Sequence, residues 1–158
     1  MKNLFKIIFL TIFLITLTAC SDVKTYKEKG LEITMDKGFY YKTHSQADVY
    51  LVKDFITFTG LKDTYASLEQ LDLNIDSDVT DYMKTLFANL GNEYAIFDDE
   101  GLKYFIYNIG DEQISYNYLV TVYKGSDGFW VCTLSTPEGI FANYQSTFIK
   151  WLKTVKVK

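Results

Sequence analysis

The stretch that most constrains the fold lies near the centre of the C-terminal half, over residues 114–135. Ile114–Lys124 and Phe129–Ser135 are rich in aromatic and β-branched residues, and Gly125–Gly128 between them has the composition of a turn. This pattern predicts a β-hairpin. Both faces of the hairpin are mostly apolar, which disfavours a sheet with one solvated face, so each face needs a cover.

The register of this hairpin follows from placing the turn at 125–128, because strand register is set by the turn. The expected facing pairs are Lys124 with Phe129, Tyr123 with Trp130, Val122 with Val131, Thr121 with Cys132, Val120 with Thr133, and Leu119 with Leu134.

Two amphipathic helices are available to cover the two faces. The first is expected over Asp78–Leu90, where apolar residues recur at helical spacing, Ser77 or Asp78 can cap the start, and Gly91 ends the helix. The second begins at Thr136-Pro137, with proline in its first turn. Its expected buried stripe is Ile140, Phe141, Tyr144, Phe148, Trp151 and Leu152.

Shorter strands are expected elsewhere in the chain, while residues 60–71 read as a loop or a short helix. Leu31–Met35 alternates as a strand does, residues 39–43 extend it, and residues 47–52 and 55–59 are further candidates. Residues 94–97 and 102–109 flank a turn at Asp98–Gly101, and residues 153–158 suit a short edge strand. The pattern predicts one α+β domain over residues 30–158: an α/β/α sandwich with a central antiparallel sheet and helices on both faces.

The N-terminus has the pattern of a bacterial lipoprotein signal over residues 1–19. Lys2 and Lys6 make a basic start, and the apolar core after them is shorter than the ~20 residues that a membrane span needs. An ordinary secretory signal and an N-terminal anchor helix are the alternatives. The core closes on a segment that resembles a lipobox: Leu17, Thr18, Ala19 and Cys20.

In signals of this type, cleavage falls between Ala19 and Cys20, and Cys20 receives the lipid. The mature side-chain charge would then be −6, because 14 lysines remain against 20 acidic residues. The lipid alone would therefore hold this acidic body on the extracytoplasmic face of the cell membrane or envelope. Residues 20–29 are expected to be the lipidated cysteine and a short polar tether.

Several short sequence segments resemble those of a known superfamily. These are residues 30–33, residues 101–105 and residues 121–130, in an order of strands, helix, two hairpins and terminal helix. Together they are similar to the PsbP-like superfamily, and more closely to its small bacterial lipoproteins of the DcrB type, over residues 30–157. The resemblance implies a central antiparallel sheet with helices on both faces and a non-enzymatic role supporting a membrane complex. It implies no set of functional residues.

Composition and motifs argue against several functions. The chain contains no arginine and has more acidic residues than lysines, which argues against nucleic-acid binding. No zinc spacing, phosphate-binding glycine loop or nucleophile elbow is present, so no metal, cofactor or enzyme activity is expected. Residues 72–78 begin like a calcium-binding loop, but Ser77 replaces its glycine and Met83 its glutamate. Residues 98–100 could hold a cation, although a solvated turn fits them better.

His44 and Cys132 are the remaining residues with catalytic potential. They could in principle form a nucleophilic pair, but Cys132 lies in the middle of an apolar strand and is expected to be buried. With Cys20 lipidated, Cys132 has no partner for a disulfide within the chain.

Tyrosines on neighbouring strands are the candidate surface for a partner protein, since tyrosine combines apolar area with a polar tip. The competing interpretation places them under the helices. The expected function is binding to an envelope protein or complex, and the alternative is a small-ligand or cation-binding lipoprotein with a pocket at one end of the sheet. The candidate residues are Tyr40, Tyr41, Tyr104, Tyr107, Tyr116 and Tyr118.

Overall fold

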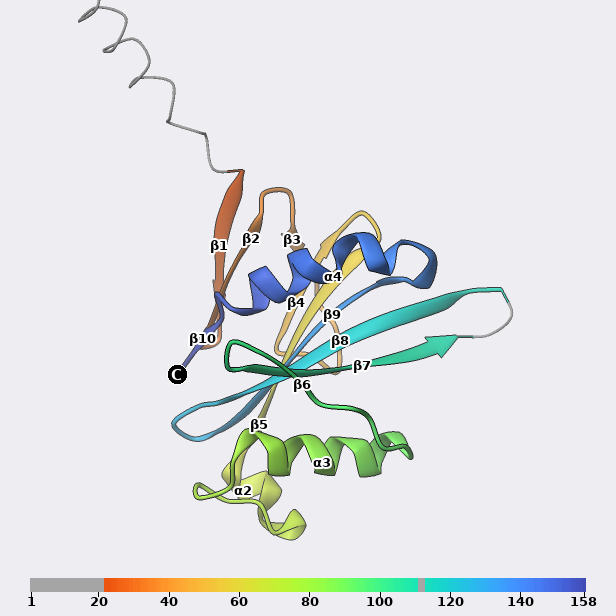
Figure 1. Ribbon diagram of the computed structural model, residues 1–158. Helices are drawn as coiled ribbons and strands as arrows, with labels where there is room; N and C mark the ends of the chain where they lie inside the picture. The colour runs from red at the N-terminus through yellow and green to blue at the C-terminus, as the bar shows by residue number, and fades with distance from the viewer. Residues whose placement is uncertain (1–21, 111–112) are drawn as a thin grey trace, which may run out of the picture.

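The computed structural model describes residues 22–110 and 113–158 (Figure 1). The predicted lipobox over residues 17–20 therefore lies outside the described residues. The elements, in chain order, are β1 (Val23–Glu28), β2 (Leu31–Asp36), β3 (Tyr40–Tyr41), β4 (Val49–Lys53), β5 (Ile56–Thr64), α2 (Tyr65–Leu68), the 3-10 helix η1 (Glu69–Leu71), α3 (Val79–Leu90), β6 (Phe97–Asp99), β7 (Leu102–Gly110), β8 (Ser115–Lys124), β9 (Gly128–Pro137), α4 (Glu138–Leu152) and β10 (Lys156–Val157).

The described residues form a seven-stranded antiparallel sheet in the order β3-β4-β5-β9-β8-β7-β6. The β8–β9 hairpin lies at its centre, and its register is the one predicted, from Lys124 opposite Phe129 to Leu119 opposite Leu134. β5 pairs with β9, which brings the N-terminal strands against the C-terminal half of the chain.

One face of this sheet is covered by α4 together with a small second sheet of order β1-β2-β10 (Figure 1). Leu119, Cys132 and Leu134 of the central hairpin are fully buried there. The helix contributes four of the six residues of its predicted stripe to the buried core, and Tyr144 packs against them, as expected for an amphipathic helix. The four are Phe141, Phe148, Trp151 and Leu152.

The opposite face is covered by α2 and α3 at one end. Tyr82, Met83 and Phe87 of α3 pack against Val120, Val122, Phe105 and Phe129 of the sheet. The helix ends at Leu90 as predicted and begins one residue later than predicted, at Val79. Asp78 is its cap: the backbone N–H groups of Thr80 and Asp81 donate to the Asp78 carboxylate, and the Asp81 carboxylate accepts from the backbone N–H of Asp78 in a capping box. Gly91 follows the last turn with positive φ. Helices therefore lie on both faces, and the predicted α+β sandwich with an antiparallel sheet is confirmed.

The prediction of a polar tether over residues 20–29 is wrong for residues 23–28. These residues form β1, which pairs along its length with β2 in the small sheet. Its side chains are exposed apart from Tyr26, which is buried in the main core and contacts Phe39 edge-to-face. The folded domain therefore begins at residue 23 rather than at residue 30.

Further boundaries differ from the sequence prediction, and one is the start of the last helix: α4 begins at Glu138, with Pro137 as its N-cap rather than in its first turn. Residues 40–41 form β3 of the large sheet rather than an extension of β2, and β5 continues to Thr64 before α2 begins. The second hairpin is shifted, since Phe97–Asp99 pairs with β7 and only Glu100 and Gly101, both with positive φ, make the turn. The tail does form a short strand, β10, at the edge of the small sheet. No helix within the described ranges is long and apolar enough to cross a membrane.

Candidate functional site

A row of facing residues crosses the sheet from β3 to β7 on the face that carries α3. The pairings that define the row are consecutive: each residue lies opposite the next on the neighbouring strand, so all six side chains share one face. The row is Tyr40, Val52, Thr57, Ser135, Tyr118 and Tyr107.

The neighbouring rows extend this surface. Tyr50 lies opposite Thr59, which lies opposite Thr133 on β9, and on the other side Ile109 of β7 lies opposite Tyr116 of β8. We call the tyrosine face the surface made by Tyr40, Tyr50, Thr57, Thr59, Tyr107, Tyr116, Tyr118, Thr133 and Ser135.

The tyrosine face occupies the part of the sheet that α3 leaves open. Figure 1 shows the β7–β8 ribbon extending past the end of α3. In the part of the chain that the structure describes, most of these side chains are partly exposed, and Tyr40 is 51% exposed. The hydroxyl groups of Thr57 and Ser135 are hydrogen-bonded at 2.6 Å in the middle of the row. The surface therefore alternates aromatic rings with hydroxyl groups.

Tyr107 and Tyr118 form a nearly parallel ring pair on this face. Their rings stack at a centroid distance of 4.8 Å and an angle of 6°, so the rings face each other and their edges point outward. Tyr94, from the loop after α3, packs against Tyr107 at 6.0 Å. Desolvation, followed by the neighbouring Tyr118 and Tyr94, raises the pKa of Tyr107 from its ordinary value of 10.0 to about 12.

A hollow of about 700 Å³ lies beside the tyrosine face, between the C-terminal half of α3 and the loop that follows it. Phe87 and Ile96 provide apolar walls, and Lys84 and Glu93 bring one charge of each sign. Tyr94 lines the hollow and also contacts Phe105 and Tyr107, so it forms the boundary between the hollow and the sheet.

The six tyrosines predicted as a surface divide between the two faces. Tyr40, Tyr107, Tyr116 and Tyr118 lie together on the tyrosine face. Tyr104 is 8% exposed, belongs to the core beneath α4 and stacks on Phe97.

The sixth residue, Tyr41, is 44% exposed but lies on the α4 side of the sheet, opposite Leu51. It contacts Tyr26 and donates a hydrogen bond to the carbonyl of Lys27. Sequence reasoning missed Tyr50 and Tyr94. The strand predicted at 47–52 could have placed Tyr50 with Val52 by alternation, whereas Tyr94 was assigned to a strand that does not include it.

His44 and Cys132 do not form a catalytic pair. The ring of His44 lies 4.9 Å from the ring of Tyr50, on the tyrosine face, while Cys132 points into the core on the opposite side of the sheet. The Cys132 side chain is fully buried, and burial raises the pKa of its thiol, which keeps it protonated and unreactive.

The acidic segments identified in the sequence have structural roles in the described chain. Asp78 caps α3, and the side chain of Asn74 accepts a hydrogen bond from the backbone of Asp76. Asp99 and Glu100 pair with Lys153 at the end of α4. Across the described ranges, no group of three or more His, Cys, Asp or Glu side chains is arranged to hold a metal ion.

Comparison with solved structures shows that the chain has a PsbP-like fold. The solution structure of cyanobacterial PsbP (CyanoP) from Synechocystis sp. PCC 6803 matches 90% of this chain and 96% of its own, with a TM-score of 0.53 and 16% sequence identity. A protein from Bacteroides thetaiotaomicron matches 87% of this chain and 42% of its own, with a TM-score of 0.41 and 9% identity. Neither the protein-family models nor the curated protein sequences gave a match. The closer resemblance to the DcrB type stays a prediction.

Proposed function

We propose that the protein is a non-enzymatic binding module, held by a lipid on Cys20 to the extracytoplasmic face of a cell membrane, that binds an envelope protein through the tyrosine face. The observation that carries this proposal is the sheet surface beyond α3, where tyrosine rings and hydroxyl groups alternate and no helix of the described residues lies over them.

The chemistry of the tyrosine face suits a protein partner. Tyrosine buries a large apolar area while its hydroxyl keeps a hydrogen-bonding group, and it loses little conformational entropy on binding. The strands beneath fix these side chains before binding, which lowers the cost of association. The hydroxyl groups of Thr59 and Thr133 supply donors and acceptors between the rings.

A lipid on Cys20 would place the tyrosine face next to proteins of the same membrane. The signal pattern that ends at Cys20 supports lipid attachment at the start of the mature chain. A lipid-anchored domain moves in two dimensions, and this raises its effective concentration for partners in the same membrane.

The positions of the candidate catalytic side chains support a non-enzymatic role. Cys132, the single thiol among the described residues, is buried and protonated, and His44 lies on the other side of the sheet. The remaining acidic clusters described here cap a helix or pair with Lys153.

Chemical crosslinking in native membranes, followed by mass spectrometry, tests the proposal. The full chain is compared with Cys20→Ala, which removes the proposed lipid site and changes no residue of the described domain. We expect one reproducible protein partner that is lost with Cys20→Ala. A chain that is folded and anchored but crosslinks to no protein would contradict the proposal.

The hollow beside α3 supports a second candidate function, the binding of a small ligand. Its volume of about 700 Å³ is within the usual range for ligand sites, and Lys84, Glu93 and Tyr94 bring polar groups to its apolar wall. A thermal-shift screen of small envelope metabolites, repeated with Lys84→Ala, tests this function. Stabilisation that depends on Lys84 would favour it over protein binding.

A further inference from the structure

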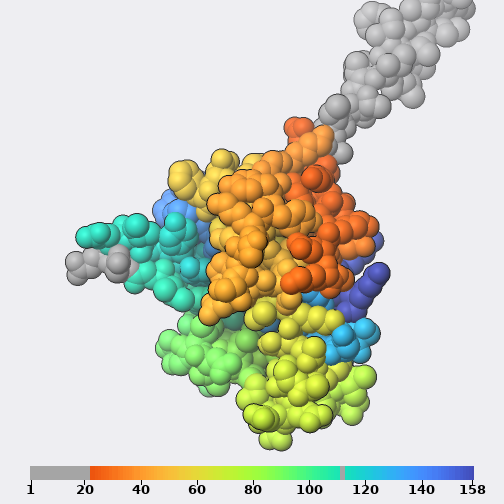
Figure 2. All heavy atoms as spheres, turned by 180° about the vertical axis from the view of Figure 1, so that it is seen from behind, coloured from red at the N-terminus to blue at the C-terminus, as the bar shows by residue number. Residues whose placement is uncertain are grey.

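The turns at one end of the domain gather where the described chain begins. Val23 lies opposite Asp36 at the start of β1, and the backbone N–H of Lys37 donates to the carbonyl of Asp22 at 2.6 Å. The Nζ of Lys53, which precedes the β4–β5 turn, lies 3.8 Å from a carboxylate oxygen of Asp36. Figures 1 and 2 both show the β4–β5 turn at this end of the molecule.

Phe55 stands at the tip of that turn. Lys53 lies opposite Ile56, so Asp54 and Phe55 alone make the turn, and Asp54 has a φ of 51°. A polar residue or a glycine is usual at such a tip, yet the Phe55 side chain is 68% exposed, the highest value among the exposed large hydrophobic residues of the described chain. Beside it, Ile140 and Tyr144 of α4 line a small hollow with Phe55.

The position of Cys20 relative to this end is limited by covalent geometry. Two peptide units separate Cys20 from Asp22, so their Cα atoms are at most about 7 Å apart whatever their conformation. A lipid on Cys20 would therefore hold the end that carries Phe55 directly against the membrane surface.

The charges at this end are balanced, in contrast to the rest of the domain. Lys24, Lys37 and Lys53 are matched there by Asp22, Asp36 and Asp54, although the mature chain carries −6. Approach of this end to an anionic surface therefore meets little repulsion, and apolar contact decides the outcome.

We propose that Phe55 inserts into the lipid–water interface and gives the anchored domain a second membrane contact. The contact fixes the orientation of the domain, with the β4–β5 turn at the membrane and the α2–η1 segment away from it. The strength with which an apolar side chain binds the lipid–water interface grows with the apolar area that it buries there. A second membrane contact of this kind strengthens the attachment that a lipid anchor provides. This inference rests on the proposed lipid at Cys20.

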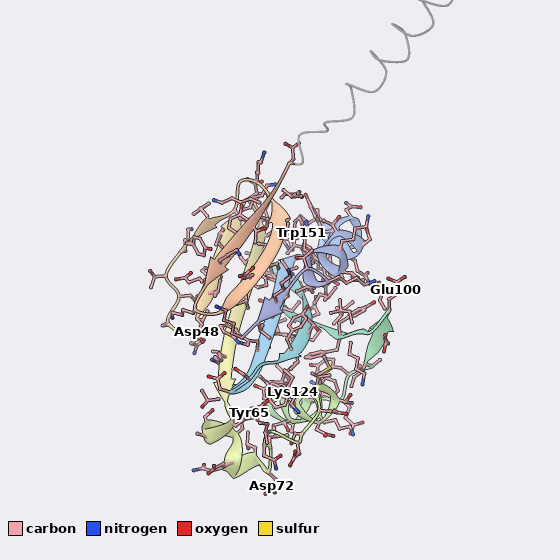
Figure 3. The ribbon with its side chains drawn as sticks, turned by 90° about the vertical axis from the view of Figure 1, so that its left-hand side faces the viewer. Asp48, Tyr65, Asp72, Glu100, Lys124 and Trp151 are labelled. Carbon is pink, nitrogen blue, oxygen red and sulfur yellow. The ribbon has the colours of Figure 1, made fainter. Side chains whose placement is uncertain are left out.

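Tryptophan fluorescence in the full lipidated chain tests this contact. Phe55→Trp places a reporter at the turn. The native chain is measured in parallel and its emission is subtracted, because Trp151, although only 6% exposed, lines the hollow beside Phe55. The control is Leu71→Trp: Leu71 is 47% exposed and precedes Asp72, which Figure 3 shows at the end of the molecule opposite the start of the described chain. Both proteins are reconstituted in phosphatidylcholine vesicles with lipids brominated at different depths.

We expect Trp at position 55 to shift to shorter wavelength and to be quenched most strongly by bromine about 5–10 Å below the headgroup boundary. Trp at position 71 should not be quenched. Co-flotation of the protein with vesicles but no quenching at position 55 would overturn the membrane contact and leave the anchor intact. Failure of the native full chain to co-float with vesicles would overturn both the anchor and the contact.

Discussion

At the scale of single residues, two tyrosine hydroxyls connect helices to the large sheet. Tyr82 of α3 donates to the carboxylate of Asp63 at the end of β5, and desolvation together with this bond raises the pKa of Tyr82. Tyr123 of β8 donates to the carbonyl of Leu152 at 2.6 Å. That carbonyl belongs to the last turn of α4, where the usual i+4 helical donors are missing, and it also accepts a hydrogen bond from the backbone N–H of Val155 at 3.0 Å. Tyr123 therefore fastens the end of α4 to the sheet.

Removing the Tyr123 hydroxyl tests the hydrogen bond that connects α4 to the sheet. Tyr123→Phe removes one of the two hydrogen bonds to the carbonyl of Leu152 and leaves the one from the backbone N–H of Val155, so we expect a loss of about 0.5–1.5 kcal/mol in the free energy of unfolding. Urea denaturation measures the change. Tyr40→Phe, at a side chain 51% exposed, is the control and should change stability by less than about 0.5 kcal/mol. Equal stability of Tyr123→Phe and the native chain would contradict this role.

At the scale of elements, the start of α3 depends on Asp78. The backbone N–H groups of Asp81 and Thr80 donate to its carboxylate and hold its pKa below the ordinary value of 3.8. A group whose pKa is lowered by folding stabilises the fold above its unfolded pKa, and this stabilisation is lost as pH falls through the lowered value.

Unfolding measured as a function of pH should show this dependence. Asp78→Ala should unfold at lower urea concentration than the native chain at neutral pH, and the difference should shrink as pH falls below about 4. Asp78→Asn keeps a good N-cap without a titrating group and is the matched control. If the difference in stability between Asp78→Ala and the native chain stayed constant from neutral to acid pH, the ionised carboxylate of Asp78 would not be the group that stabilises the start of α3.

The elements also show which parts of the fold could be read from the sequence. The central hairpin and α3 were predicted because apolar spacing, turn residues and a cap agree within a short stretch. β1 was not predicted as a strand. Five of its six side chains are exposed and Tyr26 alone is buried, so the segment has the composition of a polar linker. β3 was missed as a strand of the large sheet because two residues carry too little pattern.

At the scale of the whole molecule, the tyrosine face is produced by a pairing between distant segments. Tyr50 and Tyr118 share a face because β5 pairs with β9, which joins the N-terminal strands to the central hairpin. Spacing along the chain could not supply this strand order. Sequence spacing also could not show that α3 ends before the far part of the sheet. These tyrosines remain accessible because the helix ends there.

The extent of the domain is a second property of the whole molecule, and truncation tests it. A chain that begins at Asp22 should fold, whereas one that begins at Gly30 loses β1 and the buried ring of Tyr26. Loss of a large buried aromatic side chain costs about 3–5 kcal/mol, a large part of the stability of a domain this size. Thermal unfolding followed by circular dichroism compares the two chains. Equal midpoints would show that β1 is the dispensable tether that its composition suggests.

The most direct test of the central claim is site-specific photo-crosslinking in the native membrane. A photoreactive amino acid replaces Ile109, which is 55% exposed on β7 and lies opposite Tyr116 on the tyrosine face. The control position is Phe97, which is 47% exposed but lies opposite Tyr104, on the other face. We predict a single protein adduct from position 109 and none from position 97. Adducts from position 97 alone, or none from either position in an anchored and folded protein, would contradict binding through the tyrosine face.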